Sequence, residues 1–498
     1  MIRQITSTLA ANIWAALIGI LLVPIYVNRL GIEAYGLVGI FLTIQTLCRL
    51  FDLGIPVFIN RELARLSSNT GPSPARQLVN RLEMVYWSLA LLIGLGLYCV
   101  IPLGTAHWLR PAALDPETIR VSLQLIAVIT VFQWPASLYI GGLIGLQKQS
   151  LLALLQSGIA TGRALGAWAL VEYYPSLTTF FLWQLCVTIV SSLLLRSMLR
   201  RALPDGPQGS IPWPSIVKKI YHSLPLAGIG VLSIPLLQMD KIVLSHILPL
   251  DSYGRYILAS TITTSLYMIT NSVYNSVFPR LTKIAALANE NLLLAEYLRG
   301  TRLMGSLLLP ATLCIAIFPR EVLLAWTGSI SDDSNASTAL SLLAIGTGMH
   351  GLAHLQGALQ IACGKNRISL MVNCVAVCLC VPLVWLLACS FGILGGGIYY
   401  VALHFGMLAV HVMLTHRQLL TTARYAWFKS TLVSVIAAAM VPVALRLSVS
   451  PPSTRRECFI LLVLAGIGSS TTSLLSCVEF RAIATKCAVR IAARAQRK

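Results

Sequence analysis

The sequence predicts an all-α integral membrane protein with about 14 transmembrane helices. We expect two parallel six-helix repeats that form two lobes, followed by a C-terminal helix pair. Three observations predict this fold. Only 11% of the 498 residues are charged and the mean hydropathy is +0.78, whereas about a quarter of the residues of a soluble protein carry charge. Apolar segments long enough to cross a bilayer recur along the whole chain, and a signature near the N-terminus returns in the second half.

Each expected span is an apolar segment of about 20 residues or more, the length that a helix needs to cross ~30 Å of hydrocarbon. The connecting loops are short, and those rich in Pro and Gly are typical of irregular connectors rather than folded domains. The expected spans are 8–29, 35–60, 82–103, 119–146, 150–172, 176–199, 223–248, 254–279, 301–324, 336–362, 368–389, 392–415, 426–447 and 457–478.

The distribution of basic residues predicts the orientation. With a cytoplasmic N-terminus, 26 of the 37 Lys and Arg residues fall on the cytoplasmic side and 8 on the external side. Cytoplasmic loops of membrane proteins carry such an excess. We therefore expect both termini in the cytoplasm. The net charge of +20 then indicates orientation and attraction to anionic lipid rather than binding of nucleic acid.

An internal repeat organises the chain. Glu33-Ala34-Tyr35-Gly36 matches Asp251-Ser252-Tyr253-Gly254, 218 residues later, and the apolar segments that follow end in Asn60-Arg61 and Pro279-Arg280. Six helices separate matching positions, so the repeats share one orientation in the membrane. The predicted divisions are an N-lobe at 1–202, a cytoplasmic linker at 203–222, a C-lobe at 223–420, an extra helix pair at 421–480 and a basic cytoplasmic tail at 481–498.

Polar residues inside the expected spans are candidates for a substrate pathway, because ionised groups in hydrocarbon usually face a bundle interior or a wet cavity. Arg49 and Asp52 share one face of the second helix at i and i+3, where they either pair structurally or line a pathway. The matching eighth helix carries Asn271 and Asn275 instead. Arg163, in the middle of the fifth helix, is satisfied by a carbonyl or a distant carboxylate, or it faces a cavity.

Asp240 and Lys241 lie past the midplane of the seventh span. Side chains at i and i+1 point about 100° apart on a helix, so each charge is expected to need a partner on another helix or a ligand. Asp52 and Asp240 are the acids placed clearly inside spans, and one of them is expected to take up a proton during a transport cycle. Arg49, Arg163 and Lys241 outnumber these acids by one charge, which favours an anionic cargo.

Other residues point away from catalysis. His350 and His354 have an i, i+4 spacing that could hold a metal, but no acid joins them, so we interpret them as packing residues, like His404 and His411. The twelve cysteines lie mostly in apolar runs and are interpreted as small packing residues. The chain has no phosphate-binding loop. The sequence thus predicts a conduit without a catalytic residue, metal or cofactor.

Several stretches resemble a known family. Residues 29–36, 50–54 and 60–65 read R-L-G-I-E-A-Y-G, L-F-D-L-G and N-R-E-L-A-R. Together with M-D-K-I-V-L at 239–244 and S-Y-G-R-Y at 252–256, they resemble the signature of Wzx-type lipid-linked oligosaccharide flippases. These bacterial polysaccharide exporters share a superfamily with multidrug and toxin extruders and the lipid II flippase. The resemblance covers about residues 1–420.

The resemblance implies a helical bundle that opens alternately to either side of a bacterial inner membrane. It implies undecaprenyl-diphosphate-linked oligosaccharide as cargo, as in O-antigen and lipopolysaccharide synthesis, with membrane lipid and polymerase or chain-length machinery as partners. It also implies a cationic cavity, for which Arg49, Arg163 and Lys241 are candidates. The last two helices depart from the twelve-helix pattern of the family.

Two alternatives stay open. One is a cation-coupled antiporter for small amphipathic compounds, although the first helix lacks the acid that many multidrug extruders use. The other is an integral enzyme that transfers glycan.

Overall fold

The computed structural model describes residues 2–52, 54–67, 74–203, 212–287, 289–328 and 334–481. These ranges are helical almost throughout and contain no strand. The elements are α1 (Ile2–Leu30), α2 (Ile32–Cys48), the 3₁₀ turn η1 (Arg49–Asp52), α3 (Ile55–Ser67), α4 (Ala75–His107), α5 (Pro116–Gln133), α6 (Ala136–Gly145), α7 (Gln149–Tyr173), α8 (Leu177–Ala202), α9 (Trp213–Ile247), α10 (Leu250–Thr264), α11 (Tyr267–Ala285), α12 (Glu290–Ile317), α13 (Pro319–Thr327), α14 (Ser334–Ala362), α15 (Asn366–Phe391), α16 (Ile393–Gln418), α17 (Ala423–Ser448) and α18 (Arg455–Ser476).

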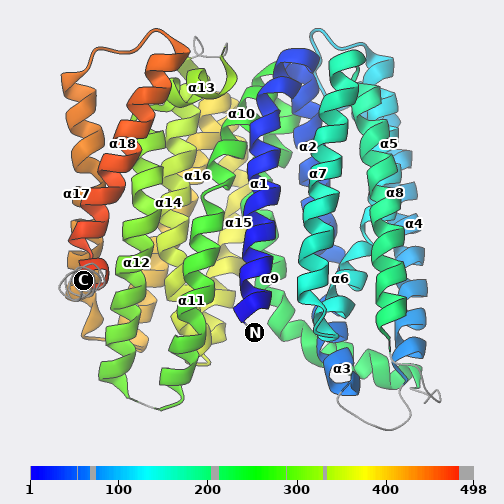
Figure 1. Ribbon diagram of the computed structural model, residues 1–498, viewed down its shortest axis with the longest axis horizontal. Coiled ribbons are helices and arrows are strands. Elements are labelled where there is room, and N and C mark those ends of the chain that lie inside the picture. The colour runs from blue at the N-terminus through cyan, green and yellow to red at the C-terminus, as the bar shows by residue number, and fades with distance from the viewer. Residues whose placement is uncertain are drawn as a thin grey trace, which may run out of the picture. The chain divides into compact units, whose positions relative to one another are not determined.

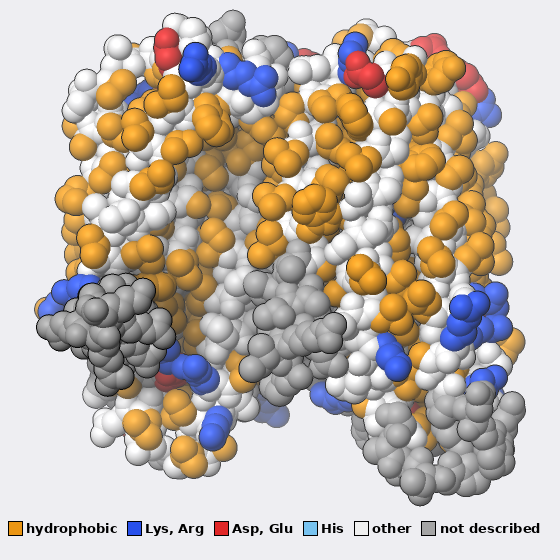
Figure 2. Space-filling model, in the orientation of Figure 1, with side chains coloured by type: hydrophobic (Ala, Val, Ile, Leu, Met, Phe, Trp, Pro, Cys, Tyr) orange, Lys and Arg blue, Asp and Glu red, His pale blue; other side chains and the backbone are white. Residues whose placement is uncertain are grey.

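The chain forms two compact units, Met1–Ile257 and Leu258–Lys498. Within each unit the long helices lie side by side along their lengths (Figure 1). Hydrophobic side chains cover the middle of the visible face of each unit, and charged side chains lie toward its ends (Figure 2). Lipid-facing helices have this distribution, because a helix satisfies its own backbone polar groups and exposes only apolar side chains to hydrocarbon.

The expected spans are found as helices. In the described part of the chain, ten helical segments are long and apolar enough to cross a membrane. The other four expected spans, 150–172, 223–248, 254–279 and 336–362, correspond to α7, α9, α10 with α11, and α14.

Four expected spans are interrupted, which corrects the prediction of continuous helices at 35–60, 119–146, 254–279 and 301–324. In the first, Gly54 has a φ of +74°, a conformation that glycine adopts without strain, and Pro56 then lies in the first turn of α3, where proline is tolerated. The break between α10 and α11 occupies the matching place in the repeat. The repeated helices therefore share a bend as well as a signature.

The division between the two units falls inside α10 rather than in the predicted linker at 203–222. The reason is that α9 packs against α2 and α3, which joins the seventh helix to the first unit. Residues 204–211 of the linker and 482–498 of the basic tail lie outside the described residues. The lobe limits 1–202 and 223–420 remain predictions. The C-terminal helices α17 and α18 pack against each other and both contact α12.

Each unit has its own hydrophobic core. In the first unit, α3, α4, α6 and α8 contribute buried residues such as Ile59, Leu82, Leu143 and Leu199. In the second, the core lies among α11, α12, α14 and α17. Because lipid tails are as apolar as these side chains, such helices associate through close packing rather than through exclusion of water.

The two copies of the repeated signature pack against each other within the first unit. A Cβ atom on Gly36 of α2 would lie 3.0 Å from the Leu250 carbonyl oxygen, and one on Gly254 of α10 would lie 2.1 Å from the Ile32 carbonyl oxygen. Only glycine permits this approach of two helix backbones. The repeated glycines thus set the crossing of α2 and α10.

Candidate functional site

A cavity of about 480 Å³ lies in the first unit where two helix interruptions meet. One is the η1 turn between α2 and α3, and the other is the Trp134–Pro135 turn between α5 and α6. The predicted pathway residues Arg49 and Asp52 and the signature residue Asn60 all line it. Its other lining residues are Gln45, Cys48, Pro56, Val57, Thr130, Gln133, Trp134, Ala136, Ser137, Ile140, Gly141 and Ile144.

Two glycines hold the walls of this cavity together. Cβ atoms on Gly141 and Gly145 of α6 would lie 2.6 Å and 2.5 Å from the carbonyl oxygens of Pro56 and Asn60 on α3. Because these contacts leave no room for a side chain, α6 can lie directly on the backbone of α3. The spacing of the glycines, one turn apart, therefore positions the breaks opposite each other.

Asp52 is held by three hydrogen-bond donors from other helices. Its Oδ1 accepts hydrogen bonds from Trp134 Nε1 at 2.8 Å, Ser137 Oγ at 2.9 Å and Tyr86 Oη at 3.3 Å. Of the two alternatives for Arg49 and Asp52, the structural pair is not formed, since neither a hydrogen bond nor an ion pair joins these two described residues. Asp52 turns toward α4, α5 and α6, whereas the Arg49 side chain is exposed.

Arg49 and three amides give the cavity its polar character. Gln45 Nε2 donates to Gln133 Oε1, which links α2 to α5 across the cavity. Asn60 adds a third amide, and apolar residues such as Val57 form the remaining wall. An exposed guanidinium can bind an anionic group bidentately, and amides donate to and accept from hydroxyl groups. The cavity can therefore bind a ligand that is both anionic and rich in hydroxyls.

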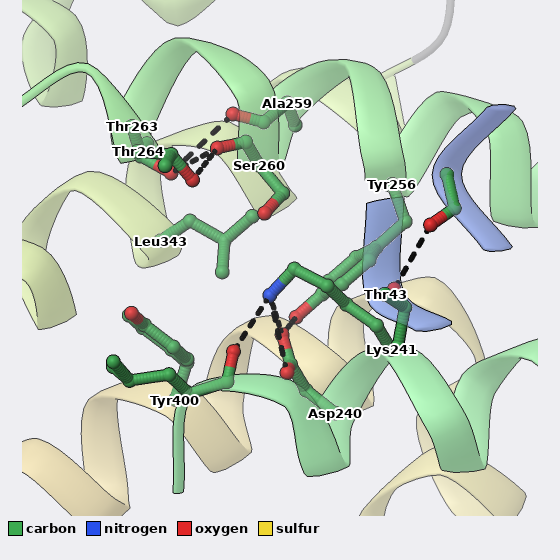
Figure 3. Close-up of polar contacts among 12 residues, drawn as sticks. Thr43, Asp240, Lys241, Tyr256, Ala259, Ser260, Thr263, Thr264, Leu343 and Tyr400 are labelled. Atoms are coloured by element: carbon green, nitrogen blue, oxygen red, sulfur yellow. Dashed lines mark hydrogen bonds and ion pairs between the residues drawn. The ribbon is translucent and has the colours of Figure 1, made fainter. Parts of the chain in front are cut away.

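Asp240 and Lys241 form a second polar site in the first unit, near the end of α9 (Figure 3). Asp240 is completely buried and accepts a 2.7 Å hydrogen bond from Tyr256 on α10. Lys241 Nζ lies 3.1 Å from Asp240 Oδ2 and also donates to the Leu237 carbonyl at 3.1 Å. The prediction that these neighbours cannot neutralise each other is wrong, because the long lysine side chain folds back along its own helix to reach the carboxylate.

Arg163 lies between α7 and α8, apart from both sites. Its Nη2 is 3.4 Å from the Thr188 hydroxyl, and its Nε is buried without a hydrogen-bond partner among the described residues. The contact of Arg163 is with a hydroxyl, a group that the sequence analysis did not name among its alternatives. The structure thus places Arg49 in the lining of this cavity, and that lining does not include Arg163 or Lys241.

The predicted stripe of Asn271 and Asn275 is exposed on α11 of the second unit. Arg280 lies further along the same helix, 3.9 Å from Glu296 on α12. Arg61, its counterpart in the first repeat, is exposed on α3 next to Asn60.

The signature acids have different partners in the two repeats. Glu33 is buried at the start of α2 and accepts hydrogen bonds of 2.9 to 3.1 Å from the backbone N–H groups of residues 112–114. This carboxylate fixes the loop before α5. Asp251 is half-exposed and lies 3.9 Å from Arg255 on its own helix. The following tyrosines, Tyr35 and Tyr253, are both buried and serve the helix packing around the repeated glycines.

Several site residues escaped the sequence analysis. Trp134, Ser137 and Tyr86 hold Asp52, and the Trp134-Pro135 pair inside an expected span could have signalled the break. Glu83 of α4 also escaped notice. It is buried, accepts hydrogen bonds from Tyr139 Oη at 2.8 Å and Arg200 Nη2 at 2.8 Å, and pairs with Arg196. In the sequence, Glu83 could have been found only through Arg196 and Arg200, two arginines spaced i, i+4 on α8.

The histidines of the second unit do not form a metal site of the usual kind. Within the described ranges no group of three or more His, Cys, Asp or Glu residues could hold a metal ion. His350 and His354 instead contact aromatic rings and each other. His411 lies 3.2 Å from Gln360 through its Nδ1.

Comparison of the sequence with known families decides the class of the protein. Residues 1–285, more than half of the chain, match the family described as polysaccharide biosynthesis protein. The chain belongs to this family. A Shigella flexneri protein named "Putative O-antigen transporter" is 21% identical over 373 residues, which cover 74% of this chain and 86% of that protein.

Solved structures share the fold of this polysaccharide biosynthesis protein. The structure titled lipid II flippase MurJ, inward closed conformation, has a TM-score of 0.68 at 14% identity and covers 98% of this chain and 100% of its own. An inward-facing multidrug resistance MATE family transporter of the MOP superfamily has a TM-score of 0.65 at 13% identity, over 90% of this chain and 99% of its own. This family member is thus a multi-pass helical membrane protein with the fold of flippases and transporters.

Proposed function

We propose that this polysaccharide biosynthesis protein is a flippase for undecaprenyl-diphosphate-linked oligosaccharide units. It moves them from the cytoplasmic to the periplasmic leaflet of a bacterial inner membrane. The observation that carries the proposal is the cavity of the first unit, which is lined by exposed Arg49 and three amides. A glycan head group needs a polar path through hydrocarbon, whereas its lipid chain can stay in the bilayer.

The cavity suits such a head group in chemistry. The guanidinium of Arg49 can bind two oxygens of one phosphate group. The amides of Gln45, Gln133 and Asn60 can bind sugar hydroxyls. Asp52 is occupied by three donors and does not cancel the charge of Arg49 through a direct contact. The cation therefore stays available to an anionic ligand.

Alternating access supplies the transport step in this proposal. The helix interruptions between α2 and α3 and between α5 and α6 border the cavity, and interrupted helices commonly form the binding sites of transporters. We propose that the protein opens this site alternately to either side of the membrane, coupled to an ion gradient. Both termini lie in the cytoplasm in this scheme, and polymerase or chain-length machinery receives the translocated glycan.

The test uses cells that lack the protein and accumulate lipid-linked glycan. Right-side-out and inside-out vesicles from these cells are probed with a membrane-impermeant lectin. We expect the glycan on the cytoplasmic leaflet, and its transfer to the outer leaflet when the wild-type gene is restored. Glycan that is exposed outside but stays unpolymerised would instead indicate an enzyme. Restored drug resistance without any glycan defect would indicate an antiporter.

Substitution of Arg49 tests the role of the cavity in export more directly. Arg49→Ala should lower export at least about tenfold, since a charge-assisted hydrogen bond contributes ~1.5–3 kcal/mol and ~1.4 kcal/mol is a factor of ten. Arg49→Lys keeps the charge and should lose less. The control is Arg120→Ala, because Arg120 is an exposed residue of α5 that, among the described residues, forms an ion pair with its helix neighbour Glu117 at 3.6 Å. Normal export by Arg49→Ala at wild-type protein levels would contradict the role of the cavity.

A further inference from the structure

One face of α11, in the second unit, is both exposed and polar. Asn271, Ser272, Asn275 and Ser276 are exposed, and their spacing places them on one side of the helix. These four residues are here named the α11 stripe. The opposite side, which includes Val273, is buried in the core of the second unit, where α11 packs against α12 and α14 (Figure 1).

Other long helices of the same unit expose apolar side chains instead. On α15, Leu379 and Leu386 are exposed, and on α17, Ile436 and Met440. Such side chains suit lipid, whereas an amide in hydrocarbon loses its hydrogen bonds to water. The α11 stripe lies inside the expected span 254–279 and exposes two amides. Its composition therefore favours water over lipid at this face.

The side chains of the α11 stripe can form hydrogen bonds with a ligand. No hydrogen bond joins the amide of Asn271 or Asn275 to another residue that the structure describes, and an amide offers both donors and an acceptor. The hydroxyls of Ser272 and Ser276 donate to backbone carbonyls of their own helix at 2.6 Å and 2.9 Å. Their oxygens can still accept. The stripe thus presents donors and acceptors side by side.

The α11 stripe is uncharged. The sequence between Thr264 and Pro279 has no Lys, Arg, Asp or Glu. Arg280 and Lys283 are exposed further along α11, and Arg280 lies 3.9 Å from Glu296 of α12. A face that offers hydrogen bonds without a charge does not select an ion. It suits an uncharged ligand with many hydroxyl groups.

Tyr274 gives the α11 stripe an aromatic border. Its ring is half-exposed and stacks on that of Phe278, with centroids 5.2 Å apart and an angle of 9° between the planes. The ring of His354 on α14 lies 4.6 Å away, and these contacts fix the orientation of Tyr274. A pyranose ring has a face of C–H groups as well as hydroxyls. An aromatic ring beside amides can therefore contact both kinds of surface.

We propose that the α11 stripe binds the uncharged sugar units of the cargo and makes export depend on the structure of the glycan. Asn271 and Asn275, about one turn apart, exchange hydrogen bonds with sugar hydroxyls, and Tyr274 packs on the C–H face of a ring. The stripe has no charge to balance the diphosphate, which Arg49 binds. The proposal rests on the proposed transport function and adds a sugar-binding surface in the second unit.

The first test asks whether the α11 stripe borders water. Wild type, Asn275→Cys and Ile436→Cys in lipid nanodiscs are treated with a sulfonated maleimide that does not enter the bilayer, and the labels are counted by mass spectrometry. We expect Asn275→Cys to carry one label more than wild type. Ile436→Cys is the control, since Ile436 is 58% exposed on an apolar face, and it should add no label. Equal labelling of Asn275→Cys and wild type would overturn the proposal.

The second test separates the two parts of the cargo. The glycan is released by mild acid from the lipid-linked pool of cells that lack the protein, and geranyl diphosphate represents the other part. Binding of each probe to protein in nanodiscs is measured by saturation-transfer difference NMR, with empty nanodiscs as the blank.

We expect the double variant Asn271→Ala with Asn275→Ala to bind the released glycan about tenfold more weakly, since each lost neutral hydrogen bond weakens binding about twofold to tenfold. Its binding of geranyl diphosphate should be unchanged. Arg49→Ala should lose geranyl diphosphate and keep the glycan. Asn366→Ala removes an exposed amide at the start of α15 and should change neither.

The outcomes distinguish the sugar-binding surface from the transport function. Unchanged glycan binding by the double variant, or an equal loss of both probes, would overturn the role of the α11 stripe. Wild-type protein that binds geranyl diphosphate but no glycan would overturn the stripe alone. Wild-type protein that binds neither probe would overturn the proposed cargo as well.

Discussion

The indole Nε1 of Trp134 donates a 2.8 Å hydrogen bond to Oδ1 of Asp52. This bond joins the interruption between α5 and α6 to the interruption between α2 and α3. The two residues are 82 positions apart in the chain and both line the cavity. The carboxylate therefore fixes the geometry of the site, while Arg49 remains open to a ligand.

Trp134→Phe tests this role. Phe keeps the ring contact with Tyr86 but removes the hydrogen bond, and a bond to a charged group contributes ~1.5–3 kcal/mol. The matched control is Trp87→Phe, whose lost bond to the Tyr139 hydroxyl at 3.2 Å joins neutral groups and contributes ~0.5–1.5 kcal/mol. Unfolding of the purified protein in detergent should show the larger loss for Trp134→Phe. Equal losses would argue against a structural role of Asp52.

Lys241 tests the second polar site. Lys241→Met leaves the fully buried Asp240 carboxylate without its cation, which should cost about 3–5 kcal/mol. Adding Asp240→Asn removes the stranded charge, so the double variant should recover most of the stability, with Tyr256 still donating to the amide oxygen. Unfolding measurements on all three proteins form a double-mutant cycle.

The same variants separate structure from cargo binding. If Lys241 only balances Asp240, the double variant exports glycan. If Lys241 holds the anionic cargo, as the sequence analysis proposed, the stable double variant stays inactive and Lys241→Arg keeps substantial activity. An undiminished stability of Lys241→Met alone would refute the ion pair.

Gly254→Ala tests the crossing of the repeated signatures. Its Cβ would lie 2.1 Å from the Ile32 carbonyl oxygen, so α2 and α10 must separate. Overpacking of this kind costs ~1–3 kcal/mol or more. At Gly158 of α7 nothing lies within 4 Å of the added Cβ, and Gly158→Ala should be neutral or slightly stabilising, since Ala is favoured by ~1 kcal/mol in a helix. Yield and thermal stability in detergent would compare the two.

Glu479, which lies outside the expected spans, should make the stability of the protein depend on pH. Burial alone would raise its pKa, but the hydrogen bonds from Arg302 and Cys477 lower the pKa to about 2. Because the folded-state pKa lies below the ordinary 4.5, the ion pair stabilises the protein above about pH 4.5 and this contribution is lost as the pH falls toward 2. Screening by solvent limits it to about 1 kcal/mol.

The measurement compares wild type with Glu479→Gln. The wild type should melt higher at pH 6, and the difference should shrink on acidification to pH 3. A difference that grows on acidification would contradict the sign of the shift. The pair joins α12 to the residues that follow α18, so the change should also loosen the C-terminal helix pair.

The sequence by itself determined the class of the protein and much of its layout. The thickness of the hydrocarbon core sets how long and how apolar a spanning helix must be, so the helical spans could be counted from local composition. The repeat at Glu33 and Asp251 located the matching helices and included Asn60, and polar residues inside apolar runs identified Arg49 and Asp52 as candidates. These properties need no knowledge of which helices touch.

Only the tertiary structure decided which partners these residues have. Asp52 is held by residues 34 to 85 positions away, and Glu33 by backbone groups 79 to 81 positions away, distances over which hydropathy patterns carry no information. Lys241 folds back onto Asp240, a rotamer that residue spacing does not specify. Apolar periodicity places a side chain on a face of its helix, but packing between helices selects the contacts that the side chain makes.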